Sequence, residues 1–463
     1  MKTLMKSSVS RLIFSALLVF SGNLSYSQQP WTLEQCIAYA LENNIQIKQQ
    51  QINTLVNENN FEQSRLDLLP DINANGNTSV SYGRALDETT YEFTDDQRVV
   101  TLNTSIGANV TLFNGLRQLN NIKLNRYSWQ QSLEELQTLR NNVSLNVASA
   151  YLQILFNIEL LEIAREQVAL SQKQVERTTS LVEAGSLPQG NKMEIEAQLA
   201  NDELQEVSAQ NQLDMAYLNL SQLLNMDSVD NFKIAQPAVE ITDNEKLPPS
   251  VSIVYNAAVQ QLPEIRASEF NKEIAKTNLS LARGGRSPRV FASASYGTGY
   301  SDIRRKIIGF DTLARETITT DYPLTEQFKD NASFVYTVGI NIPIFSGWSV
   351  ETNIKNAKLG FENANYELEN TKLQLYQEIQ QAYLDAAAAY KKYTASGRAL
   401  EAMNESFKYT QQRFDVGLIN AVEYQTATTQ LTQTESDLLQ AKYDYIFKMK
   451  ILDFYQGKPI IFE

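Results

Sequence analysis

The residues Ile106-Gly-Ala-Asn-Val-Thr-Leu-Phe-Asn-Gly115 decide the fold of this chain, because two kinds of periodicity meet in them. Up to Leu112 apolar and polar residues alternate, which is the pattern of a β-strand with two different faces. Residues 117–184 then contain neither proline nor glycine, and apolar residues recur there in steps of three and four. The sequence therefore predicts a strand that leads directly into one α-helix of roughly 100 Å.

The same arrangement occurs a second time, 232 positions later in the chain. The segment Val110-Thr-Leu-Phe-Asn-Gly115 reappears as Ile342-Pro-Ile-Phe-Ser-Gly347, and a second long helix is predicted over 348–416. Near the start of the two halves the offset is 218, so 14 residues must be inserted in the second half, in the polar stretch 301–330. The chain therefore contains two internal repeats with the same order of elements.

We expect each repeat to consist of a helix, two strands, the long helix and a returning helix. The first repeat spans 28–225 and the second 251–463, and the proline-containing segment 226–250 is predicted to be a linker. The first helices are expected at 33–68 and 251–282, each ending before a proline, and the returning helices at 193–224 and 422–455.

The four predicted strands are each about ten residues long, enough for a tilted strand to cross the hydrocarbon layer of a membrane. One face of each strand is apolar and the other carries Asn, Ser, Thr and Gly. Tyrosines near one end of the apolar face are typical of a lipid-facing aromatic girdle: Tyr82, Tyr300 and Tyr336. Strands in lipid must close into a barrel and four are too few, so copies of the chain must pool their strands. The alternative, a soluble β-sandwich, does not explain long helices that leave the sheet on one side.

Composition excludes several functions. The 463 residues include no histidine and one cysteine, with a formal net charge of −13 and a mean hydropathy of −0.33. Histidine-based catalysis, imidazole zinc sites and intramolecular disulfides are therefore excluded, and we expect no cofactor and no metal. Cys36 is expected to be a small packing residue, and the negative charge argues against nucleic acid as a partner.

The amino terminus predicts export from the cytoplasm. Residues 1–27 carry three cations, then the apolar run 12–20, then small and polar residues, which is the layout of a cleavable signal peptide. After Phe20 no stretch approaches eighteen consecutive apolar residues, which argues against a helical membrane protein. A secreted soluble protein or an outer-membrane strand protein remains.

In this order, and duplicated, these features resemble the TolC-type outer-membrane efflux family. The motifs that carry the resemblance are Leu33-Glu-Gln-Cys-Ile-Ala-Tyr-Ala-Leu41, the Leu-Pro before the first strand, the Phe-Asn-Gly and Phe-Ser-Gly turns, and Phe414-Asp-Val-Gly-Leu418. The resemblance implies a fold that is mainly α with membrane β, in which a homotrimer forms a twelve-stranded β-barrel continued by a long periplasmic α-helical barrel.

The resemblance also implies a function. Such a chain is a passive exit duct in the outer membrane, serving a tripartite efflux pump or a type I secretion system and having no catalytic activity. Its partners are two further copies, outer-membrane lipid, a periplasmic adaptor protein and, indirectly, an inner-membrane pump or ABC transporter.

Two groups of residues receive roles from this resemblance. The turns at the far ends of the long helices are the expected adaptor-docking tips, and they comprise Ala184, Gly185, Ser186, Val416, Gly417 and Leu418. Glu423 occupies the first of two positions at which family members carry gating acids, whereas Thr426 occupies the second and Ile419 the place of a gating arginine. We therefore expect a gate held less by charge, although Glu423 is equally typical of a solvated helix residue.

The alternative from another class is a trimeric coiled-coil surface adhesin with a β-barrel anchor. An adhesin would place one barrel segment at the carboxyl terminus, whereas strands are predicted here in the middle of both halves. An enzyme is disfavoured, because no cluster of carboxylates lies in a pattern resembling a cleft.

Overall fold

The computed structural model describes residues 30–460 apart from 88–90, 227–231, 238–247 and 314. The predicted signal peptide and most of the predicted linker lie outside the described residues. The chain divides into two compact units. Unit 1 comprises Met1–Lys48, Leu139–Gln261 and Gln377–Glu463, and unit 2 comprises Gln49–Thr138 and Leu262–Tyr376.

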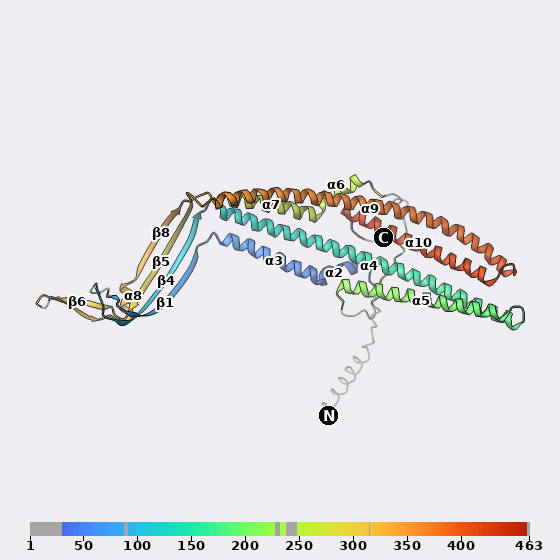
Figure 1. The fold of residues 1–463 in the computed structure, drawn as a ribbon, viewed down its shortest axis with the longest axis horizontal. Helices are drawn as coiled ribbons and strands as arrows, with labels where there is room; N and C mark the ends of the chain where they lie inside the picture. The colour runs from blue at the N-terminus through green and yellow to red at the C-terminus, as the bar shows by residue number, and fades with distance from the viewer. Residues whose placement is uncertain (1–29, 88–90, 227–231, 238–247, 314, 461–463) are drawn as a thin grey trace, which may run out of the picture. The chain divides into compact units, whose positions relative to one another are not determined.

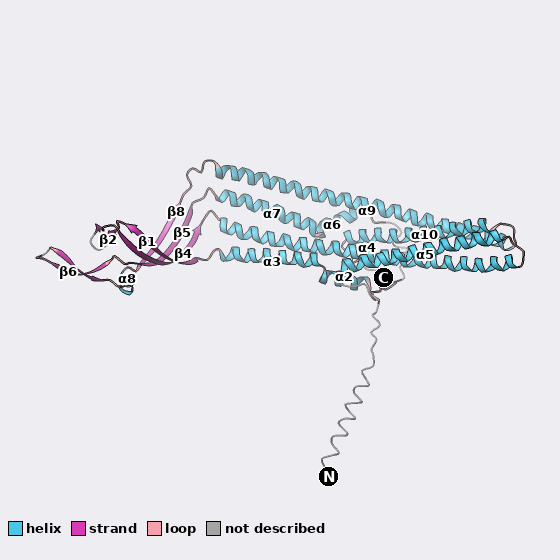
Figure 2. Ribbon diagram, turned by 60° about the horizontal axis from the view of Figure 1, so that its bottom comes forward, coloured by secondary structure: helices cyan, strands magenta, loops and turns pink. Residues whose placement is uncertain are grey.

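Unit 2 contains a four-stranded antiparallel sheet in the order β1-β4-β5-β8, drawn as magenta strands in Figure 2. The strands are β1 (Asp71–Gly83), β4 (Gln97–Phe113), β5 (Arg289–Ser301) and β8 (Ser333–Asn341). The central pair, β4 and β5, joins one strand of each repeat, and the two edges belong to β1 and β8. The sheet is thus built equally from both halves of the chain.

The register of the sheet places the predicted apolar residues on a single face. One row of paired residues crosses all four strands through Ala74, Ile106, Tyr296 and Phe334. The neighbouring row carries polar or small residues, namely Asn75, Ser105, Gly297 and Ser333. Because paired residues of an antiparallel sheet lie on the same side, the alternation seen in each strand becomes a difference between two whole faces.

The strand β8 ends before the apolar alternation in its sequence does. The apolar alternation continues to Ile344, but pairing with β5 stops at Asn341. Pro343 has no N–H group to donate to a neighbouring strand, so the sequence beyond Asn341 leaves the sheet. Ile342 and Ile344 are exposed residues of the turn that follows.

The insertion in the second repeat forms a hairpin and a short helix. The hairpin consists of β6 (Arg305–Asp311) and β7 (Glu316–Asp321), and α8 (Leu324–Asp330) packs against β5. β8 begins at Ser333, opposite Gly297, so the end of β5 extends past it. There the fully buried amide of Gln327 donates 3.0 Å to the Ser301 carbonyl and accepts 3.0 Å from the Ser301 N–H. This side chain thus replaces a strand partner at the edge of β5.

The first helix of each repeat is interrupted, which the sequence pattern did not predict. α2 (Leu33–Asn43) and α3 (Ile45–Leu66) are separated at Asn44, whose side-chain oxygen accepts from the N–H groups of Gln46 and Ile47. α6 (Val251–Gln261) and α7 (Pro263–Gly284) are separated at Leu262. Pro263 starts the new helix at its first position, where the missing N–H group is not needed.

The two long helices begin and end within one residue of the predicted positions. They are α4 (Arg117–Glu183) and α9 (Ser349–Asp415), each of 67 residues. Each starts after two consecutive left-handed residues, Gly115 and Leu116 before α4 and Gly347 and Trp348 before α9. The left-handed glycines explain why the Phe-Asn-Gly and Phe-Ser-Gly motifs are repeated.

In unit 1 the long helices are paired with returning helices. α5 (Gln189–Leu224) runs back along the end of α4, and α10 (Ala421–Tyr455) runs back along the end of α9 (Figures 1 and 2). The core includes Val147, Tyr151 and Ile154 of α4, which are almost completely buried. The Tyr151 hydroxyl lies within hydrogen-bond distance of the carbonyls of Trp31 and Ala235, which ties α4 to the start of the first repeat and to the segment that follows this repeat.

The same region of α4 contains an 18-residue stretch that is long and apolar enough to cross a membrane, with half of the stretch buried. A count of consecutive apolar residues misses it because polar residues interrupt the stretch. Cys36 is buried as predicted, and burial raises the pKa of its thiol to about 12. The thiol is therefore protonated and serves in packing.

Candidate functional site

The turn between α4 and α5 is closed by a glycine in the left-handed conformation. Gly185 has φ +71°, its N–H donates to the Val182 carbonyl, and the Ser186 N–H donates to the Leu181 carbonyl. These are the two hydrogen bonds of a Schellman helix end. A Cβ at Gly185 would touch nothing within 4 Å, so backbone conformation and not crowding requires the glycine.

The turn between α9 and α10 has the same geometry. Gly417 has φ +75°, its N–H donates to the Phe414 carbonyl, and the Leu418 N–H donates to the Arg413 carbonyl. Val416 and Leu418 are each 71 % exposed. This turn therefore presents two apolar side chains to the outside of the described chain.

The two turns differ in how the returning helix begins. α5 starts after Pro188, which forms no side-chain cap, whereas α10 starts after Asn420. The Asn420 side-chain oxygen accepts 2.8 Å from the Glu423 N–H, and its amide donates 3.3 Å to a Glu423 carboxylate oxygen. The second turn is therefore fixed by side chains that the first one lacks.

Glu423 is the third residue of α10 and is exposed, as is Thr426 one turn later. The position of Glu423 also favours a carboxylate through the partial positive charge of the helix amino terminus. Ile419 is only 9 % exposed, so its side chain is buried while Glu423 and Thr426 are exposed. The hydrogen bond that the Glu423 carboxylate accepts from the Asn420 side chain gives this residue a local structural role beside the predicted gating role.

An ion pair between the two helical hairpins was not predicted. Arg177 of α4 contacts Asp415 of α9 at 2.7 Å, and the Phe414 ring next to it stacks on Tyr424 of α10, with 4.5 Å between ring centres. Phe414 and Asp415 lie in a motif that carries the family resemblance, so the sequence marks these two residues. Nothing in the spacing of the sequence indicates that Arg177 is their partner.

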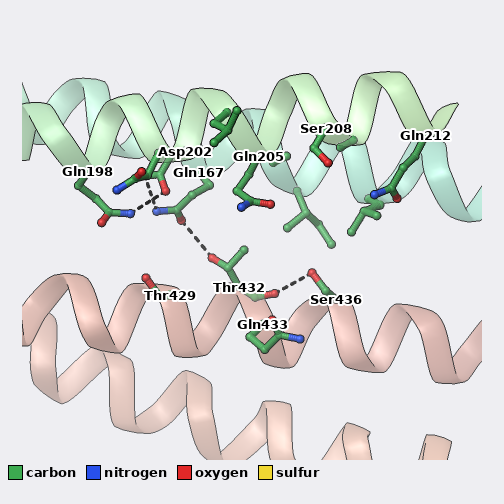
Figure 3. Close-up of a pocket in the computed structure, with 16 residues that line it drawn as sticks. Gln167, Gln198, Asp202, Gln205, Ser208, Gln212, Thr429, Thr432, Gln433 and Ser436 are labelled. Atoms are coloured by element: carbon green, nitrogen blue, oxygen red, sulfur yellow. Dashed lines mark hydrogen bonds between the residues drawn. The ribbon is translucent and has the colours of Figure 1, made fainter. Parts of the chain in front are cut away.

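The sequence pattern also did not predict a polar cavity in unit 1. It lies between α4 and α5 on one side and α10 on the other, and has a volume of about 470 Å³ (Figure 3). Glutamine, serine and threonine side chains dominate its surface, and Asp202 is the charged residue among those that line it. Such residues occur throughout these helices, so no local pattern marks the cavity.

The tyrosines predicted to form a girdle lie on the apolar face of the sheet. Tyr82 pairs with Arg98, Tyr300 with Leu102 and Tyr336 with Ala294. The register therefore spreads them along the strands and does not set them side by side. Among the described residues, no group of three or more His, Cys, Asp and Glu side chains is arranged to hold a metal ion.

Comparison with known proteins identifies the family. The sequence model of the family described as "Outer membrane efflux protein" matches residues 36–226 and 254–452, which is most of the chain and includes both repeats. The chain belongs to the outer membrane efflux protein family.

Relatives of this efflux protein include the outer membrane protein TolC of Escherichia coli, 25 % identical over 372 residues, 74 % of this chain and 71 % of TolC. A crystal structure of CusC matches with a TM-score of 0.76 and 18 % identity, covering 92 % of both chains. The open state of the MtrE channel of Neisseria gonorrhoeae matches with a TM-score of 0.70 and 20 % identity, covering 92 % of this chain and 88 % of MtrE.

The predicted fold class, function and location are confirmed by these findings. The efflux protein is an outer-membrane exit duct of an efflux pump, built as a trimeric channel with a β-barrel and a periplasmic α-helical barrel. The sheet of unit 2 supplies its strands, and the paired helices of unit 1 belong to its periplasmic part.

Proposed function

We propose that the channel is a passive conduit without catalytic activity, in which neighbouring copies join through β1 of one chain and β8 of the next. The observation that carries this proposal is the sheet of unit 2. Its outer strands pair on one side only among the described residues, and one of its faces is apolar. Joining β8 to β1 pairs the backbone N–H and carbonyl groups at both edges of the sheet. It also turns the apolar face to lipid and turns Asn75 and Ser105 toward water.

The assembly and its conductance test this proposal together. The full chain, extracted from outer membranes in detergent, should have the mass of three copies and should give ohmic conductance in a planar bilayer. A monomer would overturn the joining of edges, and a trimer that does not conduct would overturn the conduit. The second outcome is what a surface adhesin predicts.

The helix turns support a docking role toward a periplasmic adaptor protein. Val416 and Leu418 offer exposed apolar surface at a turn whose backbone is fixed by Gly417 and by the Asn420 cap. The first turn, at Ala184, Gly185 and Ser186, lacks that cap, so we infer that the two turns bind an adaptor differently. Leu418→Asp should abolish efflux of a dye from living cells while the purified trimer still conducts.

The start of α10 supports a gating role for Glu423. Three copies would contribute three exposed carboxylates, each oriented by Asn420. Thr426 supplies no second charge, and the buried Ile419 supplies no cation. The closed pore would therefore be held less by charge than a gate with two rings of acids.

A further inference from the structure

The cavity between α5 and α10 has the size and lining of a small-molecule site. Its volume of about 470 Å³ falls in the range of ligand pockets. Leu160, Ile163, Ala164, Leu204 and Ala209 supply apolar surface, and the remaining lining residues are polar. Figure 3 shows Gln198, Asp202 and Gln205 on α5 facing Thr429, Thr432 and Gln433 on α10.

Asp202 places a carboxylate in the wall of this cavity. Its residue surface is only 7 % exposed, and its partners are neutral: Gln198 donates at 2.8 Å, Gln167 donates at 3.3 Å, and the Ser171 hydroxyl donates as well. The Gln167 oxygen in turn accepts 3.0 Å from Thr432, so this network reaches across the cavity to α10. Asp202 forms no ion pair among the described residues, so its buried charge is not neutralised there.

The surroundings of the cavity are negative. None of the sixteen lining residues is Lys or Arg. Arg165 of α4 is held at 3.2 Å by Glu206 and at 3.2 Å by Gln210. Glu435 of α10 also lies near a second carboxylate, Glu166 of α4, and its pKa is raised by burial and by that neighbour. A cation in the cavity would therefore be attracted by several acidic groups.

We propose that this cavity binds a small organic cation, with Asp202 as the countercharge. One carboxylate with neutral amide and hydroxyl neighbours is a poor site for Ca²⁺ or Mg²⁺, which require several oxygen ligands in a defined shell. An organic ammonium or iminium ion needs a single countercharge and places its carbon skeleton on the apolar part of the lining. Binding compensates the buried charge of Asp202.

A fluorescent cation tests the proposal directly. Ethidium is titrated against the purified full-length trimer in detergent, and binding is followed by fluorescence anisotropy. Asp202→Asn should weaken binding at least about tenfold, because it removes the charge and keeps the shape of the side chain. Asp214→Asn is the matched control on the same helix, since Asp214 is exposed and accepts a 2.8 Å hydrogen bond from Gln210. It should leave binding unchanged.

A second variant and a neutral probe separate binding from structural damage. Ser208→Phe fills the cavity from an exposed position of α5 and should also weaken ethidium binding without lowering the unfolding temperature. The uncharged dye N-phenyl-1-naphthylamine should bind equally to the wild type and Asp202→Asn. Equal ethidium affinity in wild type and Asp202→Asn, or equal loss for both dyes, would overturn the proposal. Conductance of the same trimers reports the conduit separately.

Discussion

Arg177 of α4 donates a 2.7 Å hydrogen bond to Asp415, the last residue of α9, and its guanidinium lies 5.4 Å from the centre of the Phe414 ring. Both partners are about half exposed, so the pair contributes at most about 1 kcal/mol to the free energy of unfolding. Its importance lies in its location, because it joins one helical hairpin to the other near the turns that we propose as docking tips.

We therefore predict that Arg177→Ala raises single-channel conductance while the unfolding temperature changes little. The control is Arg65→Ala, which removes an exposed ion pair with Glu62 inside one helix and should leave conductance unchanged. A double-mutant cycle with Asp415→Ala should give a coupling of at most about 1 kcal/mol that weakens in high salt. Equal conductance in all four proteins of the cycle would show that this ion pair between the hairpins does not limit the conductance of the channel.

Substitutions at Glu423 and at Thr426, one helical turn later, change the charge at the start of α10 in opposite directions. Glu423→Ala should raise conductance and reduce block by multivalent cations, because a ring of three carboxylates is lost. Thr426→Glu should do the opposite, because it adds a second ring one helical turn away. Unchanged conductance and cation block in Glu423→Ala would show that the carboxylate serves only the local contact with Asn420.

Gly417 and Gly185 are predicted to be needed for their backbone conformation. Gly417→Ala should destabilise the turn by about 1 kcal/mol, because an L-residue is disfavoured at φ +75°. Trypsin cleavage after the exposed Arg413 should then become faster. Gly190→Ala is the control, since Gly190 lies within α5, where an added Cβ would touch nothing within 4 Å, and it should be neutral or stabilise by about 0.5–1 kcal/mol.

Gln327 is predicted to hold the outer end of β5. Gln327→Ala leaves the Ser301 N–H and carbonyl without their side-chain partner and should cost about 1–3 kcal/mol. Hydrogen exchange at Ser301 should accelerate in this variant. Thr325→Ala, at an exposed position of the same helix, should leave both the stability and the exchange unchanged.

Glu435 is predicted to make the stability of the protein depend on pH. Its pKa is raised above the ordinary value of 4.5 by burial and then by Glu166. The folded state therefore favours the protonated form of Glu435. The contribution of this group to the stability is fully present below pH 4.5 and is lost as the pH rises through the raised pKa. Glu435→Gln should therefore unfold at a higher temperature than the wild type at pH 7 and at the same temperature in acid. The effect should stay below about 1 kcal/mol because the side chain is partly solvated.

The repeat pattern was sufficient to predict the four strands of the sheet, the long helices and their turns. Alternation, the lack of proline and the glycine positions are local signals, and each acts through the backbone of its own segment. The break at Asn44 was missed because asparagine fits the composition of the surrounding helix. Its effect comes from one side-chain oxygen that accepts from two N–H groups.

Contacts between distant segments could not be predicted from the sequence pattern. The pairing of Arg177 with Asp415 requires two helical hairpins to lie together, and the surroundings of Asp202 require three helices. Gln327 likewise looks like any polar loop residue until β5 is seen to extend past β8. In each case the residue type is ordinary, and the fold decides what it touches.

The open edges of β1 and β8 have a consequence for assembly. A single chain cannot complete its sheet, so the last step of folding requires encounters between copies, and its rate must depend on their concentration. Until those encounters occur, each chain carries an apolar face and two strand edges that can pair with any exposed strand. Slow synthesis would therefore favour degradation, or pairing with the strands of other proteins, over pore formation, and the cell must keep newly exported chains apart from other unfinished sheets.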